Sequence, residues 1–123
     1  MHSLAEDRDE ILQLLYRYNH AIDSGDAEGW ADTFVEDGSL DAAGQLISGR
    51  EELVEFASSV RGLRHLVANP VVDISGDAAT VRAYLLVFMG TAPAMIGTYE
   101  DEVVRTPAGW RFATRQFTVD PPT

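Results

Sequence analysis

The spacing of apolar residues changes from a helical period to a strand period near residue 62, and this change constrains the fold more than any other feature. Before that point, apolar residues recur at steps of three and four, which predicts an amphipathic helix over residues 5–24. The members of this stripe are Ile11, Leu14, Leu15, Tyr18 and Ile22. A second helix is expected over residues 27–34, and a third from about residue 50 to residue 60.

Capping and turn residues mark the ends of these helices. Gly25 stands where a helix stop is expected, and Asp26 can cap the helix that follows. Ser48 and Glu51 match a capping box, in which a hydroxyl and a carboxylate three residues apart bind backbone N–H groups. Between the second and third helices, the sequence predicts a turn at residues 37–38 and a short hairpin near residues 43–44.

After residue 62 the alternating pattern predicts long strands joined by short turns. The expected strands are residues 63–74, 79–88, 97–105 and 110–119. Pro70 lacks a backbone donor and predicts that the first of them is broken or lies at a sheet edge. Residues 89–95 are expected to form a loop over the mouth of a pocket. Three helices followed by strands predict one α+β domain over residues 1–123, with the helices on one side of a strongly curled sheet.

Composition narrows the partners that such a domain can have. The chain has 123 residues, 46% of them hydrophobic, and no cysteine, which allows a sizeable core and excludes thiolate metal sites and cysteine nucleophiles. Its formal net charge of −11 repels phosphate backbones and anionic membranes, so neither nucleic acid nor a membrane is expected as a partner. The first residues lack the basic start and apolar stretch of a signal peptide, and we expect a cytoplasmic protein.

A few polar residues stand at unusual positions. The chain has no glycine-rich phosphate loop, nucleophile elbow or metal-binding histidine pair, so neither a cofactor nor a metal is expected. Tyr18 lies on the apolar stripe, where a buried hydroxyl needs a partner. Asp23 lies in the last helical turn, where the helix dipole disfavours a carboxylate. Alternation places His65 and Asn69 on one apolar strand face, whereas His20 is expected to face solvent. Each of these residues also has a purely structural interpretation, as a satisfied core group or a solvated side chain.

Several segments together resemble the SnoaL-like branch of the NTF2-like superfamily. They are Tyr18–Asp26, Trp30, Phe34, Asp37-Gly38, Gly49–Leu53, His65–Asn69, Gly97–Asp101 and Gly109–Phe112, which span nearly the whole chain. The resemblance implies a cone, in which a curved mixed sheet encloses a deep apolar pocket capped by the helices. It also implies that Tyr18, Asp23 and His65 correspond to the Tyr, Asp and His that line the pocket in dehydratase-type members, which need no cofactor.

The resemblance implies a dehydratase acting on a small apolar carbonyl compound. His65 would be the base, Asp23 would orient its imidazole, and Tyr18 would donate a hydrogen bond to the developing enolate or departing hydroxyl. The expected substrate contacts are Asn69, Trp30, Phe34 and Tyr99.

Other functions stay open at this point. A ketosteroid-isomerase-like isomerase would need a base on the first strand, where the alignment places Ala42 rather than Asp41. Epoxide hydrolases of the superfamily use an Asp–Arg–Asp arrangement, but a cross-strand salt bridge explains Asp101 and Arg115 more simply. A polyketide cyclase, a non-catalytic ligand carrier and a dimerisation module are further alternatives. In each case the uncovered sheet face favours a homodimer.

Overall fold

The computed structural model describes residues 2–121 and begins with the long helix α1 (Leu4–Ser24). The side chain of Ser3 accepts a hydrogen bond from the Glu6 N–H at its start, and Gly25 ends it in the left-handed conformation at φ 79°. This positive φ suits glycine, which has no Cβ to clash with the backbone. The first predicted helix and its stop signal are therefore confirmed.

Within residues 2–121, none of the helices combines the length and the apolar character needed to cross a bilayer.

The second helix is shorter than the sequence predicted. The N-cap of helix α2 (Ala27–Ala31) is Asp26, whose carboxylate accepts the Gly29 N–H at 2.9 Å, as expected. It ends before Phe34, which instead begins strand β1 (Phe34–Ala42) and pairs with Phe112. The four-residue spacing of Trp30 and Phe34 fits a helix, but strand pairing overrides this local preference.

Helix α3 (Arg50–Ser59) begins without the predicted capping box. Gly49 is its N-cap, at φ 84°, and offers no side chain to the helix. Glu52, rather than Glu51, reaches back and accepts the Ser48 N–H at 3.1 Å. The left-handed glycine starts the helix one residue later than the sequence pattern suggested, so the carboxylate one position further along faces the orphan donor.

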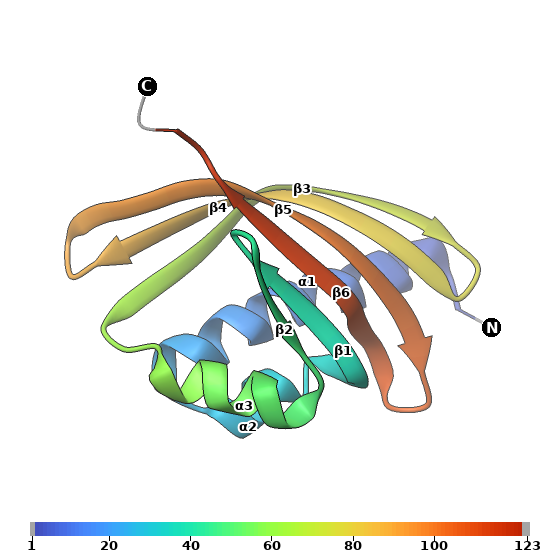
Figure 1. Cartoon of the computed structure of the whole chain (residues 1–123). Coiled ribbons are helices and arrows are strands. Elements are labelled where there is room, and N and C mark those ends of the chain that lie inside the picture. Colours follow the sequence, from blue (N-terminus) through green and yellow to red (C-terminus); the bar gives the residue numbers. More distant parts are fainter. Residues whose placement is uncertain (1, 122–123) are drawn as a thin grey trace.

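The remaining chain forms one six-stranded sheet with the order β2-β1-β6-β5-β4-β3. Its other strands are β2 (Gln45–Ser48), β3 (Leu63–Ser75), β4 (Ala78–Met89), β5 (Ala92–Thr106) and β6 (Gly109–Val119). All neighbours are antiparallel except β1 and β6, which are parallel. The sheet curves over α1, α2 and α3, which all lie on its concave side (Figure 1). The expected α+β architecture is thus confirmed: β3 to β6 are the four long strands predicted, and β1 and β2 are the arms of the predicted short hairpin.

Two predicted irregular segments belong to strands. Asp37 and Gly38 lie inside β1, where the register against β6 shifts between Phe34 and Ser39, so they form a bulge rather than a turn. Residues 89–95 are almost entirely strand, because β4 and β5 continue to Met89 and from Ala92. A two-residue connection replaces the predicted loop over a pocket. The expected hairpin at residues 43–44 does join β1 to β2.

Strand β3 is an edge strand with a bulge, which the proline at position 70 anticipated. Its register against β4 shifts between Ala68 and Val71, and Asn69 has a positive φ of 52°. A bulge moves the following side chains to the opposite face. Asn69 and Val71 are consequently exposed whereas His65 is half-buried, which corrects the expectation that they share one apolar face.

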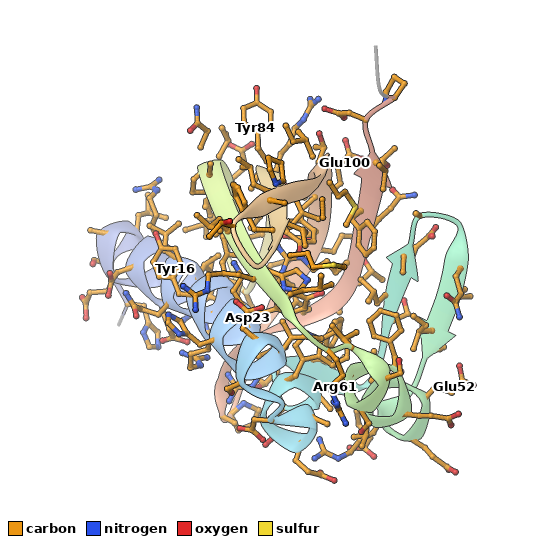
Figure 2. The ribbon with its side chains drawn as sticks, turned by 90° about the vertical axis from the view of Figure 1, so that its left-hand side faces the viewer. Tyr16, Asp23, Glu52, Arg61, Tyr84 and Glu100 are labelled. Atoms are coloured by element: carbon orange, nitrogen blue, oxygen red, sulfur yellow. The ribbon has the colours of Figure 1, made fainter. Side chains whose placement is uncertain are left out.

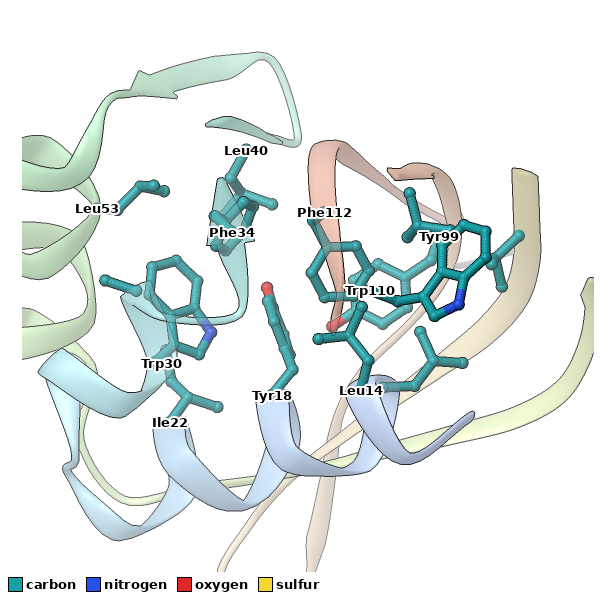
Figure 3. Packing of buried hydrophobic residues seen from close by; sticks show 14 of the residues in the cluster. Leu14, Tyr18, Ile22, Trp30, Phe34, Leu40, Leu53, Tyr99, Trp110 and Phe112 are labelled. Atoms are coloured by element: carbon teal, nitrogen blue, oxygen red, sulfur yellow. The ribbon is translucent and has the colours of Figure 1, made fainter. Parts of the chain in front are cut away.

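Aromatic side chains fill the space between the sheet and the helices. The Tyr18 ring lies between Trp30 on one side and Phe112 on the other, with centroid distances of 5.3 and 5.6 Å (Figure 3). Phe34 contacts the same group, 5.4 Å from Phe112. On the convex face, by contrast, Tyr84 points away from the helices and is 52% exposed (Figure 2).

Candidate functional site

The carboxylate of Asp23 and the imidazole of His65 form a direct pair, although 42 positions separate them in the chain. Asp23 Oδ1 lies 2.6 Å from His65 Nδ1, and the side chains are only 20% and 12% exposed. The backbone N–H of His65 also donates to the same carboxylate, at 3.0 Å to Oδ2 and 3.2 Å to Oδ1. Two donors of one residue therefore converge on one carboxylate, which fixes both the strand and the ring.

The position of this pair follows from the sheet edge. Strand β3 has β4 on one side only, so its other edge presents backbone N–H groups without strand partners. The C-terminal half of α1 passes along β3, and Asp23 lies where the two meet (Figure 2). Gly25 ends the helix directly after this contact. The helix dipole disfavours the Asp23 carboxylate, but the carboxylate gains two hydrogen bonds. These bonds explain why an aspartate lies in the last turn of α1.

A small open cavity of about 210 Å³ adjoins the imidazole. Its lining comes from α1 and β3 and comprises Tyr16, Asn19, His20, His65, Leu66 and Val67. Asn19 is buried at 7% exposure, and its Oδ1 has no hydrogen-bond partner among the described residues. Sequence reasoning did not select Tyr16 or Asn19. The sequence could have indicated Asn19, because it follows Tyr18 at the border of the apolar stripe, and an amide at this position is at least partly buried. The expected exposure of His20 is confirmed.

Tyr18 occupies a different environment from the Asp23–His65 pair. It is 3% exposed and packs within the aromatic core, where its ring stacks against the guanidinium of Arg115, with Cζ 4.3 Å from the ring centroid. Burial raises the pKa of the Tyr18 hydroxyl, and the positive charge of Arg115 opposes this shift only in part. The hydroxyl accordingly stays protonated over the physiological pH range.

The expected cross-strand ion pair between Asp101 and Arg115 forms at the centre of the sheet. The two residues are register partners on β5 and β6, and Arg115 Nε lies 3.0 Å from Asp101 Oδ1. Both side chains are at most 1% exposed, and the guanidinium also lies 3.3 Å from the Tyr99 ring centroid. The angles at the 3.0 Å contact do not satisfy a hydrogen bond, so the contact is chiefly electrostatic. Burial raises the pKa of Asp101 to about 6, although Arg115 opposes the shift.

The other residues selected from sequence are spread over the domain. Trp30 and Tyr99 are core residues at 0% and 1% exposure, Phe34 is 5% exposed, and Asn69 lies at the exposed bulge of β3. Asp41, considered as the base of an isomerase, accepts the Gly44 N–H at 2.8 Å and stabilises the β1–β2 hairpin. Within residues 2–121, no three His, Asp or Glu side chains are grouped as metal ligands.

Comparisons with known proteins agree with this architecture. The model of the SnoaL-like domain family matches residues 3–116. An uncharacterized protein of Mycobacterium tuberculosis is 33% identical over 129 aligned positions, which cover 94% of this chain and 88% of the relative.

Solved structures extend the comparison. An NTF2-like protein with a cystatin-like fold from Novosphingobium aromaticivorans is 32% identical, with a TM-score of 0.90 over 98% of this chain and 86% of that one. A proposed scytalone dehydratase from the same organism shares the fold at 24% identity, with a TM-score of 0.81 over 93% and 84% of the two chains. By its family match and by its fold, this chain belongs to the SnoaL-like domain family, within the NTF2-like proteins.

Proposed function

We propose that the protein is a cofactor-independent lyase that eliminates water from a small β-hydroxy carbonyl compound, with His65 as the base. The observation that carries this proposal is the 2.6 Å contact between Asp23 Oδ1 and His65 Nδ1. A carboxylate that accepts the Nδ1–H bond leaves the Nε2 lone pair free to take a proton, and it stabilises the imidazolium that forms. A second hydrogen bond from the His65 backbone holds the carboxylate in place.

The reaction proceeds by proton transfer and loss of the hydroxyl group. His65 Nε2 takes the proton next to the carbonyl group, and the electrons of the broken C–H bond form the new double bond. The C–O bond at the β carbon breaks, and the departing hydroxide takes a proton from the acid, which completes a water molecule. We assign the acid to Tyr18, because it corresponds to the Tyr of the dehydratase-type members and its hydroxyl is protonated at neutral pH.

We infer the substrate class from the side chains around Tyr18 and from the family. The core around Tyr18 is aromatic, with Trp30, Phe34 and Tyr99 close to it, so an apolar ring system is the substrate that these contacts favour. We assign these three residues, together with Asn69, to substrate binding. The proposed scytalone dehydratase among the fold relatives supports elimination chemistry on this scaffold.

The test compares variants on a panel of β-hydroxy ketones and cyclic β-hydroxy carbonyl compounds, with the conjugated product followed by ultraviolet absorbance. His65→Gln and Asp23→Asn should each lower kcat by roughly 10²–10⁴-fold, the range for loss of a general base. His2→Gln is the control, since His2 is an exposed histidine remote from the pair in the chain, and it should retain full activity. Folded His65→Gln and Asp23→Asn proteins with normal turnover would exclude this assignment.

A non-catalytic module that binds a ligand or a second copy is the competing function. The observation in its favour is the packing of Tyr18, which at 3% exposure resembles a structural core residue. Tyr18→Phe separates the two functions, because it should strongly reduce turnover in a lyase and leave ligand affinity unchanged in a carrier. Ligand binding without any turnover across the panel would favour the carrier.

We also propose that two copies pair through the convex face of the sheet. Val71, Tyr84 and Ile96 are 60%, 52% and 53% exposed there, and burial of such side chains favours association. Light scattering at micromolar concentration should give the mass of a dimer, and Tyr84→Lys should shift it to the monomer. A monomer mass for the unchanged protein contradicts the proposal.

A further inference from the structure

A second cavity, of about 340 Å³, lies between α1, α2 and the start of β6. Arg17 and His20 line it from α1, Arg111 lines it from β6, and Asp26 and Asp32 line it from the two ends of α2. We refer to it as the arginine cavity. Its volume lies in the range of small-ligand sites, roughly 300–1,000 Å³. It shares only His20 with the cavity beside His65, so the two openings are neighbours on α1.

The carboxylates of the arginine cavity are already engaged elsewhere. Asp26 accepts the Gly29 N–H at 2.9 Å as the cap of α2. Asp32 Oδ1 lies 2.6 Å from Arg50 Nη1 and ties α2 to α3. The acidic groups therefore serve the local fold, and neither of them lies within 4 Å of a basic side chain of the cavity among the described residues.

The basic side chains of the cavity, in contrast, have no carboxylate of their own. Neither Arg17 nor Arg111 has an acidic oxygen within 4 Å in residues 2–121, and the one hydrogen bond of the Arg111 guanidinium goes from Nη1 to the Trp110 carbonyl at 2.8 Å. Arg111 is half-buried, and its pKa is lowered first by burial and then by the positive charge of Arg17. Asp32 and Glu10 oppose that shift without removing it.

Beside its two engaged carboxylates, the arginine cavity thus holds two guanidinium groups that repel each other and have no carboxylate partner among residues 2–121. An oxyanion placed between them would relieve the repulsion and accept the unused N–H groups, because the planar guanidinium fork matches carboxylate and phosphate oxygens. We propose that the arginine cavity binds an oxyanion group, a carboxylate or a phosphate, of a small molecule. The site is separate from the Asp23–His65 chemistry and does not depend on it.

The test is an NMR titration of the whole chain with sodium phosphate and, separately, sodium acetate, at constant ionic strength maintained with chloride. Saturable shifts at the Arg17 and Arg111 side-chain N–H signals are expected for the preferred anion. The comparison of the two anions identifies the source of the oxyanion. Shifts that grow without saturation, or that are identical with chloride alone, overturn the proposal.

Variants locate the binding. Arg17→Gln and Arg111→Gln should each weaken binding by about tenfold or more, as expected when a charged donor is lost. Arg17→Lys keeps the charge without the fork and should recover only part of the affinity. Arg8→Gln is the matched control, an exposed arginine on the same helix outside the cavity, and should bind as the unchanged protein does. Equal losses in Arg8→Gln and Arg17→Gln would mean that binding follows overall charge, which also overturns the proposal.

Discussion

Replacing Asp23 should destabilise the fold measurably, because one carboxylate anchors the free edge of β3 to α1. It accepts a ring N–H and a backbone N–H of His65, and hydrogen bonds to charged groups contribute about 1.5–3 kcal/mol each. The pair is 12–20% exposed, so the lower end of that range applies, and the two bonds together contribute about 3 kcal/mol. Removal of the carboxylate also relieves about 0.5 kcal/mol of unfavourable interaction with the helix dipole.

The expected loss for Asp23→Ala is therefore about 2–3 kcal/mol. Asp23→Asn keeps one oxygen acceptor and should lose about half as much. Urea unfolding at neutral pH measures both values, and hydrogen exchange of the His65 amide reports whether the edge of β3 opens locally.

Asp9→Ala is the control, since Asp9 is an exposed carboxylate on the same helix, and it should stay within about 0.5 kcal/mol of the unchanged protein. The reasoning is refuted if Asp23→Ala also stays within that margin, because the convergent bonds would then contribute nothing to folding. The unfolding curves also show under which conditions Asp23→Asn is folded. Only under those conditions can a loss of turnover be attributed to the catalytic role of Asp23.

Of three further predictions, two concern buried carboxylates and one concerns a close backbone contact. Asp101 ionises near pH 6 when folded and near 3.8 when unfolded, so its contribution favours folding below pH 3.8 and is lost as the pH rises through 6. Asp101→Asn, which cannot ionise, should therefore gain about 2–3 kcal/mol relative to the unchanged protein between pH 4 and pH 7, measured by urea unfolding; a constant difference contradicts this. The pKa of Asp7 is lowered, chiefly by its hydrogen bond with Arg105, so its stabilising contribution is complete above pH 3.8 and lost as the pH falls through the folded pKa. In acid titrations followed by circular dichroism, Asp7→Asn should show less loss of stability below pH 4 than the unchanged protein, and parallel curves would contradict this. Gly97→Ala should lower the free energy of unfolding by about 1–3 kcal/mol or more, because the alanine Cβ would lie 2.2 Å from the Thr118 carbonyl oxygen. Thermal unfolding measures this loss. An unchanged Tm would show that β5 and β6 separate at little cost.

The sequence alone determined the elements whose signals are local. The apolar stripe of α1 and the capping Asp26 required only neighbouring residues, and both were predicted correctly. Pro70 likewise indicated an edge strand, because a proline cannot donate to a ladder. Asp23 and His65 could be selected as candidates, since each is a polar group at a position that its element disfavours or buries.

Only the tertiary structure decided how these elements meet. Phe34 became a strand residue because β6 lies beside it, and residues near 90 became strand because β4 and β5 pair there. The bulge at Asn69 reversed the face of the strand, which no alternation pattern encodes. The contact between Asp23 and His65 spans 42 positions and exists because a free sheet edge and a helix end happen to satisfy each other's hydrogen bonds. Local pattern specifies which groups need a partner, and the packing of the whole chain specifies which partner they find.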